Sequence, residues 1–399
     1  MKYLLTEPGP LQELEEGFLD ELVGLGYSPR TSGVQLNLMR HLSSWLGTRG
    51  LGAGDLTGEV VAAFIAVRRQ THSSPKSVRA LNALLNYLRQ RALTPAALIA
   101  APSTSAEILS ERFGNYLTSE RGLARETVRS YLSQVRPFLA TYSDTERLAS
   151  LSERQVSAFV TARAIGQCPR SLNVGVNALR CLLRWMWRER IVSVSLAEAT
   201  GSVAFNHASL PRALGSGEVK SLFAALSVEG NTRLRDEAML NSMLRLGLRA
   251  GEVASLGLDD IDWRLGRVIV HGKGSRRDQL PLPVDVGQSF VAYLKHGRPK
   301  GVAHRQLFLA LAAPHGPLGS GAVTAVVIRA MARADISGPG AAHRLRHTAA
   351  CRVLAQGGGL VEVGQLLRHS SPASTAPYAK SDLVAMATLV RPWITEVSL

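Results

Sequence analysis

Residues 366–378, LLRHSSPASTAPY, decide the fold of this chain of 399 residues. An apolar helix end leads into His369, a turn of small residues follows, and Tyr378 comes nine positions after the histidine. Upstream lie the motifs HRLRH (residues 343–347) and GLRAGE (residues 247–252), with a GKG turn between them. The reactive side chains of these motifs are Arg249, Lys273, His343, Arg346, His369 and Tyr378. Such groups can bind a phosphodiester, attack it and protonate its leaving group.

The composition is that of a basic globular protein. There are 46 Lys and Arg residues against 31 Asp and Glu, a formal net charge of +15, and hydrophobic residues make up 46% of the chain. This length predicts roughly two to four domains. The charge favours a polyanionic partner, because phosphate contacts release counterions and dominate the affinity for nucleic acid. Charge alone leaves open a basic protein with no such partner.

Several other classes of protein are disfavoured. Three widely spaced cysteines with no CxxC motif argue against a disulfide framework or a zinc site. The sequence has no long uncharged apolar run and no signal-peptide pattern, which predicts a cytoplasmic protein without a membrane span. The sequence also contains no GxxxxGK[ST], HExxH or DxDxDG motif, so we expect neither a metal nor a nucleotide cofactor.

The N-terminal half contains an internal repeat. Residues 18–46 correspond to residues 113–142 at an offset of 96, and the match continues further along both copies with slightly different offsets. Each copy has helical periodicity, so we expect two all-α domains, residues 1–101 and 105–200. We expect Thr31 in the first copy and Thr127 in the second to cap a helix.

One helix of the second copy combines an apolar and a basic face. The spacing predicts a core stripe formed by Val128, Tyr131, Leu132, Val135 and Phe138. Three arginines lie off that stripe, at positions 125, 129 and 136. We interpret Arg125, Arg129 and Arg136 as DNA-facing, with a solvated helix face as the alternative.

The third part follows a linker at residues 201–211 and covers residues 212–399. Helices are expected from Ser216 to Leu226 and at residues 234–248, 284–296, 320–334, 343–356 and 360–368. Between them, residues 261–283 alternate apolar and polar around the GKG turn, which predicts short antiparallel strands. The predicted fold class is therefore mainly α with one small antiparallel sheet, in which two helical domains precede a mixed α+β domain.

The order of motifs is more specific than any one of them. GLRxxE, GKG between strands, HxLRH, LxHSS and a tyrosine nine residues later resemble the tyrosine recombinases, or phage integrase family, with the Xer recombinases and transposon integrases most similar in style. The resemblance covers residues 210–399. Residues 105–200 also resemble the helical SAM-like core-binding domain of that family.

The resemblance implies a nucleophile and a phosphate clamp. Tyr378 would attack the scissile phosphate, leaving a 3′-phosphotyrosyl link and a free 5′-hydroxyl. Arg249 and Arg346 would hold the two non-bridging oxygens, where negative charge builds up in the transition state.

The remaining site residues take roles around this step by the same resemblance. Lys273 would protonate the departing 5′-oxygen, and His343 would be the acid/base partner of the tyrosine hydroxyl. His369 would donate a second hydrogen bond to the phosphate. Glu252 would orient Arg249, with an exposed acid at a helix start as the alternative.

The resemblance further implies a site-specific DNA recombinase that needs no metal or ATP. Its partners would be double-stranded DNA with inverted-repeat core sites and three further copies of the chain, forming a tetramer on two duplexes. Arg276 and Arg277, just after the GKG turn, are added as DNA-contacting candidates. The alternatives are a type IB topoisomerase-like or hairpin-forming relative, and a non-catalytic DNA-binding protein of the same fold.

The sequence departs from the family pattern at three places. Arg344 stands where an acidic residue is usual, Arg368 stands where glycine is usual, and Pro377 directly precedes the tyrosine. We expect both arginines to add positive charge near the site. Pro377 is expected to open the helix that carries Tyr378 or to hold an inactive state.

Overall fold

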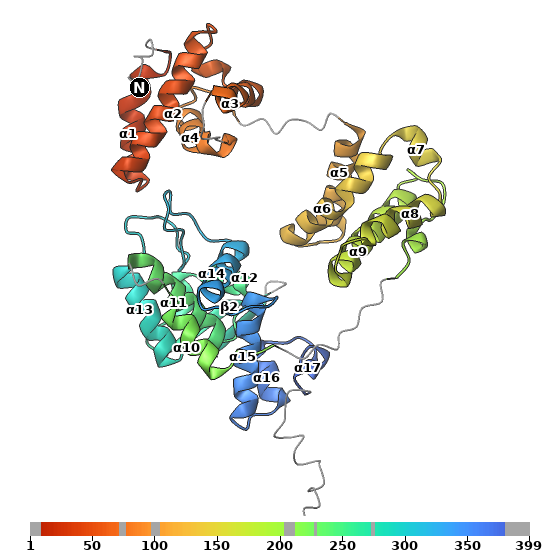
Figure 1. Ribbon diagram of the computed structural model, residues 1–399, viewed down its shortest axis with the longest axis vertical. Coiled ribbons are helices and arrows are strands. Elements are labelled where there is room, and N and C mark those ends of the chain that lie inside the picture. Colours follow the sequence, from red (N-terminus) through yellow and green to blue (C-terminus); the bar gives the residue numbers. More distant parts are fainter. Residues whose placement is uncertain are drawn as a thin grey trace, which may run out of the picture. The chain divides into compact units, whose positions relative to one another are not determined.

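A computed structural model describes residues 9–71, 77–96, 104–202, 212–226, 230–272 and 276–379. The chain divides into two compact units, Pro95–His207 and Met1–Thr94 with Ala208–Leu399. The buried hydrophobic residues form three large cores, one in each of the N-terminal, middle and C-terminal parts of the chain. Figure 1 shows the helices and strands of these three parts. That these parts are domains with the expected boundaries stays a prediction.

The N-terminal part is an all-helical bundle. Its elements are η1 (Gln12–Leu14), α1 (Glu15–Gly24), α2 (Pro29–Gly47), η2 (Ala53–Asp55), α3 (Gly58–Thr71), η3 (Val78–Leu81) and α4 (Asn82–Gln90). Phe18 on α1, Leu42 on α2 and Leu88 on α4 are fully buried in its core. The ring of Phe18 packs 5.2 Å from that of Tyr87, centroid to centroid.

The middle part is a second helical bundle with a core of its own. Its elements are α5 (Ser105–Asn115), the π-helical turn η4 (Tyr116–Glu120), α6 (Arg125–Tyr142), α7 (Thr145–Ala149), α8 (Glu153–Ala164), α9 (Pro169–Arg188) and η5 (Ala197–Thr200). The predicted stripe on α6 is confirmed, since Val128, Val135 and Phe138 are buried and Tyr131 and Leu132 pack against them.

The expected helix caps at Thr31 and Thr127 are wrong. Helix α2 begins at Pro29 after Ser28, whose hydroxyl accepts a hydrogen bond from the Thr31 backbone N–H at 3.3 Å. Helix α6 begins at Arg125, two residues before Thr127. Each threonine therefore lies inside the first helical turn. The fixed φ of proline suits the first helical position, so α2 starts earlier than the threonine pattern suggested.

The C-terminal part is mixed α+β. Its elements are α10 (Ser216–Ala224), α11 (Gly230–Arg245), α12 (Ala250–Ser255), η6 (Leu258–Asp260), β1 (Ile261–Asp262), β2 (Arg267–His271), β3 (Arg277–Pro281), α13 (Val284–His296), α14 (Ser320–Arg333), α15 (Ala341–Ala355), α16 (Leu360–Leu367), η8 (Pro372–Ser374) and α17 (Ala376–Ala379). Helix α11 is central, because it packs against α13 and α15 and buries Met239, Leu240 and Met243 completely.

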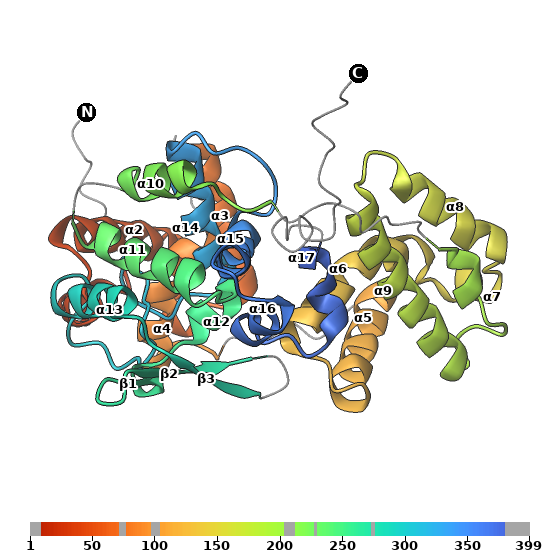
Figure 2. The ribbon, with the colours of Figure 1, turned by 90° about the horizontal axis from the view of Figure 1, so that it is seen from below.

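The strands form one antiparallel sheet in the order β1-β2-β3. Figure 2 shows them side by side at one edge of the helices of this part. Val268 pairs with Leu280 and is fully buried, while its neighbour Ile269 is only partly covered. This alternation follows from the period of two in a strand, and it confirms the strands predicted around the GKG turn.

The predicted fold class is confirmed, with helices dominating and one small sheet. Pro377 stands in the first turn of α17, where a proline is tolerated because the N–H it lacks has no partner inside the helix. Among the residues that the structure describes, no helix is long and apolar enough to cross a membrane.

Candidate active site

Tyr378 lies on the four-residue helix α17, with its side chain turned into the protein. It is 3% exposed and packs with Ala350 and Leu354 of α15 and with Val363 and Leu367 of α16. Burial raises its pKa to about 12, although the nearby guanidinium groups act in the opposite direction. The phenol is therefore protonated at neutral pH.

The hydroxyl of Tyr378 lies 2.5 Å from Nδ1 of His347, one helical turn after His343 on α15. The rings of the two histidines are 4.8 Å apart and nearly perpendicular. Burial, followed by the charges of His343, Arg346 and His369, lowers the pKa of His347 to about 4. His347 is therefore neutral at neutral pH. Its Nδ1 can accept the hydrogen bond that the phenol donates, with the ring proton on Nε2.

His369 approaches the same tyrosine from the turn after α16. Its ring is roughly parallel to that of Tyr378, at 6.4 Å between centroids. Its Nδ1 lies 2.7 Å from the hydroxyl of Thr375, a distance that fixes the ring's orientation. Burial, followed by the charge of Arg346, lowers the pKa of His369 to about 4. When Nδ1 accepts from Thr375, Nε2 carries the proton and can donate it to a ligand.

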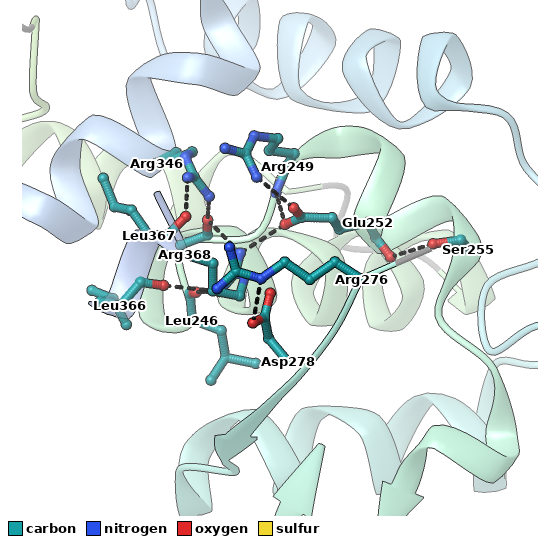
Figure 3. A network of polar contacts seen from close by, with 11 residues as sticks. Leu246, Arg249, Glu252, Ser255, Arg276, Asp278, Arg346, Leu366, Leu367 and Arg368 are labelled. Atoms are coloured by element: carbon teal, nitrogen blue, oxygen red, sulfur yellow. Dashed lines mark hydrogen bonds and ion pairs between the residues drawn. The ribbon is translucent and has the colours of Figure 1, made fainter. Parts of the chain in front are cut away.

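Arg346 is almost completely buried on α15. Its guanidinium donates hydrogen bonds to the backbone carbonyls of Gly247 and Leu367. Burial and the nearby charges of Arg249 and Arg368 lower its pKa to about 10, so it stays charged at neutral pH. Figure 3 shows Arg346 and Arg249 side by side.

Gly247 makes this close packing possible. Its φ of +59° lies in the left-handed region, and a Cβ there would come within 2.8 Å of Leu367 Cδ2. A glycine therefore allows the loop before α12 to reach the end of α16.

Arg249 is the N-cap residue of α12 and is tied to Glu252 in that helix. Glu252 Oε2 accepts from the Arg249 backbone N–H at 2.9 Å, and Oε1 accepts from Nη1 at 2.7 Å. The Arg249 side chain remains 44% exposed, whereas that of Glu252 is buried at 6%. Burial alone would raise the pKa of Glu252, but Arg368 and Arg249 hold it below its ordinary value. Glu252 is thus a buried anion and not an exposed acid at a helix start.

The two arginines that depart from the family pattern are both turned inward (Figure 3 for Arg368). Arg368 donates to Glu252 Oε2 at 2.7 Å. Arg344 donates to the carbonyls of Ser337 and Arg212 at 2.7 and 3.3 Å and approaches Glu218 at 3.5 Å. Buried cations need such partners. The expected positive charge near the site is confirmed for Arg368, whose charge contributes to lowering the pKa values of Arg346 and His369. Neither Arg344 nor Arg368 is exposed, however, so neither guanidinium is open to solvent.

A cavity of about 680 Å³ lies between β3 and α16. Arg276, Arg368 and His369 contribute to its wall, which also carries Leu280 and Leu360. Tyr378 is not among its lining residues, so the phenol does not open into this space.

Two protein families match parts of this chain. The one described as phage integrase family matches residues 212–383, and the one described as phage integrase, N-terminal SAM-like domain, matches residues 110–190. A putative integrase/recombinase of Sinorhizobium fredii, y4rA, is 34% identical over 98% of this chain and 99% of its own length. The chain belongs to the phage integrase family.

One further relative is similar to this chain in sequence, and two solved structures share its fold. Tyrosine recombinase XerD of Lacticaseibacillus casei is 31% identical over 67% of this chain and 91% of its own length. The fold is shared with XerH site-specific recombinase bound to a palindromic difH substrate, at a TM-score of 0.57 and 16% identity over 84% of this chain and 94% of that one. The fold is also shared with a lambda integrase dimer bound to a COC′ core site. Here the TM-score is 0.51 and the identity is 18%, over 68% of this chain and 94% of that one. This phage integrase family chain is a site-specific DNA recombinase.

In the structure of this phage integrase family member, most of the predicted site residues lie close together. Arg249, Arg346, His369 and Tyr378 surround one place, formed by the start of α12 with α15, α16 and α17. His343 adjoins them through the ring of His347. Lys273 lies outside the described residues. The described ranges contain no group of three or more His, Cys, Asp or Glu residues that could hold a metal ion.

The candidates for DNA contact in this family member are all exposed. Arg276 pairs with Asp278 at 2.9 Å, and Arg277 is exposed on β3. Arg125, Arg129 and Arg136 are all exposed on α6 of the middle unit, where Arg129 pairs with Glu126 at 2.9 Å. Their contact with DNA stays a prediction.

Sequence reasoning missed the contact of His347 with Tyr378 and the inward direction of Arg368. A signal for the first was present, because His343 and His347 are four residues apart and therefore share one face of a helix.

Proposed function

We propose that this recombinase cleaves and rejoins DNA strands through a covalent bond between Tyr378 and a 3′-phosphate. The phenol oxygen attacks the scissile phosphorus, the bond from phosphorus to the 5′-oxygen breaks, and a 5′-hydroxyl leaves. Attack by the 5′-hydroxyl of another strand reverses these steps, so exchange is close to energetically neutral. The observation that supports this most directly is the grouping of Tyr378 with Arg249, Arg346 and His369.

The two arginines suit the binding of the attacked phosphate. The pentavalent transition state carries extra negative charge on its non-bridging oxygens, which guanidinium groups stabilise best. Arg346 is held rigidly by two backbone carbonyls, whereas Arg249 keeps an exposed guanidinium beside it. His369, whose Nδ1 is occupied by Thr375, would donate from Nε2 to the same phosphate.

The tyrosine proton needs an acceptor, because the pKa of Tyr378 is about 12. His347 is suited to accept it, since it is neutral and its Nδ1 already lies 2.5 Å from the phenol oxygen. This replaces the sequence-based assignment to His343, whose ring instead contacts that of His347. Lys273, by the family resemblance, would deliver a proton to the leaving 5′-oxygen.

The burial of Tyr378 adds one requirement. A side chain that is 3% exposed cannot reach a backbone phosphate of a duplex, so α17 must shift outward before attack. This helix has only four residues, and a short helix holds its place mainly through its packing contacts.

The DNA partner and the assembly are proposed from the relatives. Solved neighbours include complexes with a core site, with a palindromic substrate and, for lambda integrase, a tetramer on a Holliday junction. We propose that four copies of this chain act on two duplexes with inverted-repeat core sites. The helical N-terminal and middle parts would bind the duplex as two domains, and a DNA substrate favours a cytoplasmic location.

The experiment uses a substrate that the protein itself selects. Wild-type protein is incubated with a pool of randomised nicked duplexes, and the sequence found in covalent protein–DNA adducts becomes the test substrate. Tyr378→Phe is expected to bind this duplex and to form no adduct, because phenylalanine lacks the attacking oxygen. An adduct formed by the Phe variant would overturn the assignment of the nucleophile.

A further inference from the structure

The side chain of Arg368 makes several hydrogen bonds beside Arg249 and Arg346, the two arginines proposed to bind phosphate. The roles expected from the sequence do not explain these bonds. The residue ends α16 with a φ of +53°, a conformation that favours glycine. Its guanidinium does not point to solvent, since the side chain is only 3% exposed. An arginine held in an unfavourable backbone conformation and buried needs strong compensating contacts.

Those contacts go to the segment that carries Arg249. Nη1 of Arg368 donates to the carbonyls of Leu246 and Leu366 at 3.2 and 2.8 Å. Nη2 donates to Glu252 Oε2 at 2.7 Å and approaches the Gly247 carbonyl at 3.4 Å. The end of α16 is thereby tied to the loop before α12 (Figure 3).

Two of these acceptors are shared with the phosphate-binding arginines. The Gly247 carbonyl accepts from both Arg346 and Arg368. Glu252 Oε2 accepts from both the Arg249 backbone N–H and Arg368. One side chain therefore contacts the supports of both Arg249 and Arg346.

The charges give this contact a second effect. A lone buried carboxylate would attract the Arg249 guanidinium strongly, which opposes its transfer to a DNA phosphate. Arg368 supplies Glu252 with a second, buried cation. From its guanidinium, Arg249 donates only Nη1 to Glu252, and the Arg249 side chain stays 44% exposed.

We propose that Arg368 is a positioning residue, which acts through Glu252 and the 246–247 carbonyls to hold Arg249 and Arg346 toward one phosphate. This inference depends on the proposed roles of Arg249 and Arg346. It assigns a function to a position where the sequence departs from the glycine usual in the family.

The main test variant is Arg368→Gly, because glycine accepts the left-handed backbone and the variant is expected to fold. Cleavage is measured as the single-turnover rate of adduct formation on the selected nicked duplex, and affinity is measured on the same duplex. We expect cleavage to slow by about 100-fold through misplacement of the arginines. Affinity should change by less than about threefold, since other phosphate contacts remain.

A double-mutant cycle separates positioning from general structural damage. If Arg368 acts through Glu252, the variant carrying both Arg368→Gly and Glu252→Gln should cleave no more than about threefold more slowly than the slower single variant. Independent, multiplying effects of the two substitutions would overturn the proposal. So would a folded Arg368→Gly protein that cleaves at the wild-type rate.

Arg344 provides a matched control. It is as buried as Arg368, at 7% for each whole residue, and also donates to backbone carbonyls, but outside this network. Arg344→Lys should affect thermal stability about as much as Arg368→Lys, while only the latter should slow cleavage. Tyr378→Phe is tested in parallel. A covalent adduct formed by Tyr378→Phe would overturn the proposed function. If Tyr378→Phe forms no adduct but Arg368→Gly cleaves at the wild-type rate, only the inference about Arg368 is overturned.

Discussion

The hydroxyl of Tyr378 and Nδ1 of His347 lie 2.5 Å apart, so the proposed nucleophile and a neutral proton acceptor are already in contact. His347 stands directly after Arg346 in the chain and one helical turn beyond His343. The same stretch of α15 thus carries both the proposed phosphate-binding group and the proposed acceptor for the tyrosine proton.

His347→Phe should slow cleavage by about 100-fold, because the phenol then loses its proton acceptor. The matched variant is His343→Phe, which leaves the bond to Tyr378 in place and should slow cleavage less. Both rates are measured as adduct formation on the selected nicked duplex, with affinity as the check on folding. A larger loss for His343→Phe would return the acceptor role to the first histidine of the motif.

Stability should fall as the pH drops from 6.5 to about 4. The pKa values of His347 and His369 are lowered from 6.5 to about 4 in the folded protein. In this range the unfolded chain binds more protons than the folded one, so acid favours unfolding. The stability that the two neutral histidines contribute is fully present above pH 6.5. Thermal midpoints recorded across this range for wild type and for His347→Asn provide the measurement. The variant should show the shallower dependence, and equal slopes would contradict the assignment.

Gly247→Ala should destabilise the protein more than Gly266→Ala. Both glycines have a φ near +60°, but a Cβ at Gly266 would meet no atom within 4 Å, whereas one at Gly247 would collide with Leu367. Strain alone costs about 1–3 kcal/mol, and overpacking adds about 1–3 kcal/mol at Gly247 only. Urea unfolding gives both free energies. Equal losses of unfolding free energy would mean that the Leu367 side chain can move aside at no measurable energetic cost.

The arginines of α6 should differ in their effect on DNA binding. Arg125→Ala is expected to reduce the slope of log affinity against log salt by about 0.9, the value for one phosphate contact. Arg129→Ala should reduce it less, because Glu126 already neutralises part of its charge. Binding is titrated on the selected duplex at several salt concentrations. An unchanged slope for Arg125→Ala would assign that residue to a solvated helix face.

The fold was largely predictable because its elements have strong periodic patterns. The stripe on α6 and the alternation across Arg267–Pro281 depend on which side chains are apolar, and this the sequence states directly. Helix starts were less predictable. Thr31 and Thr127 resemble caps, yet the preceding residues already meet the geometry of a first turn.

The site was predictable in its motifs but not in its contacts. Sequence spacing places His343 and His347 on one helix face, yet which of them meets Tyr378 depends on how α17 packs against α15. For Arg368, the sequence predicted only a positive charge near the site. Its actual direction is set by Glu252 and by carbonyls more than a hundred residues away in the chain.

The inward packing of Tyr378 also has a consequence for DNA that is not a target of this protein. An enzyme able to break chromosomes without an external energy source is a hazard wherever it meets the wrong sequence. Because Tyr378 packs among aliphatic side chains, the proposed nucleophile of a copy that diffuses along unrelated DNA is shielded from its phosphates.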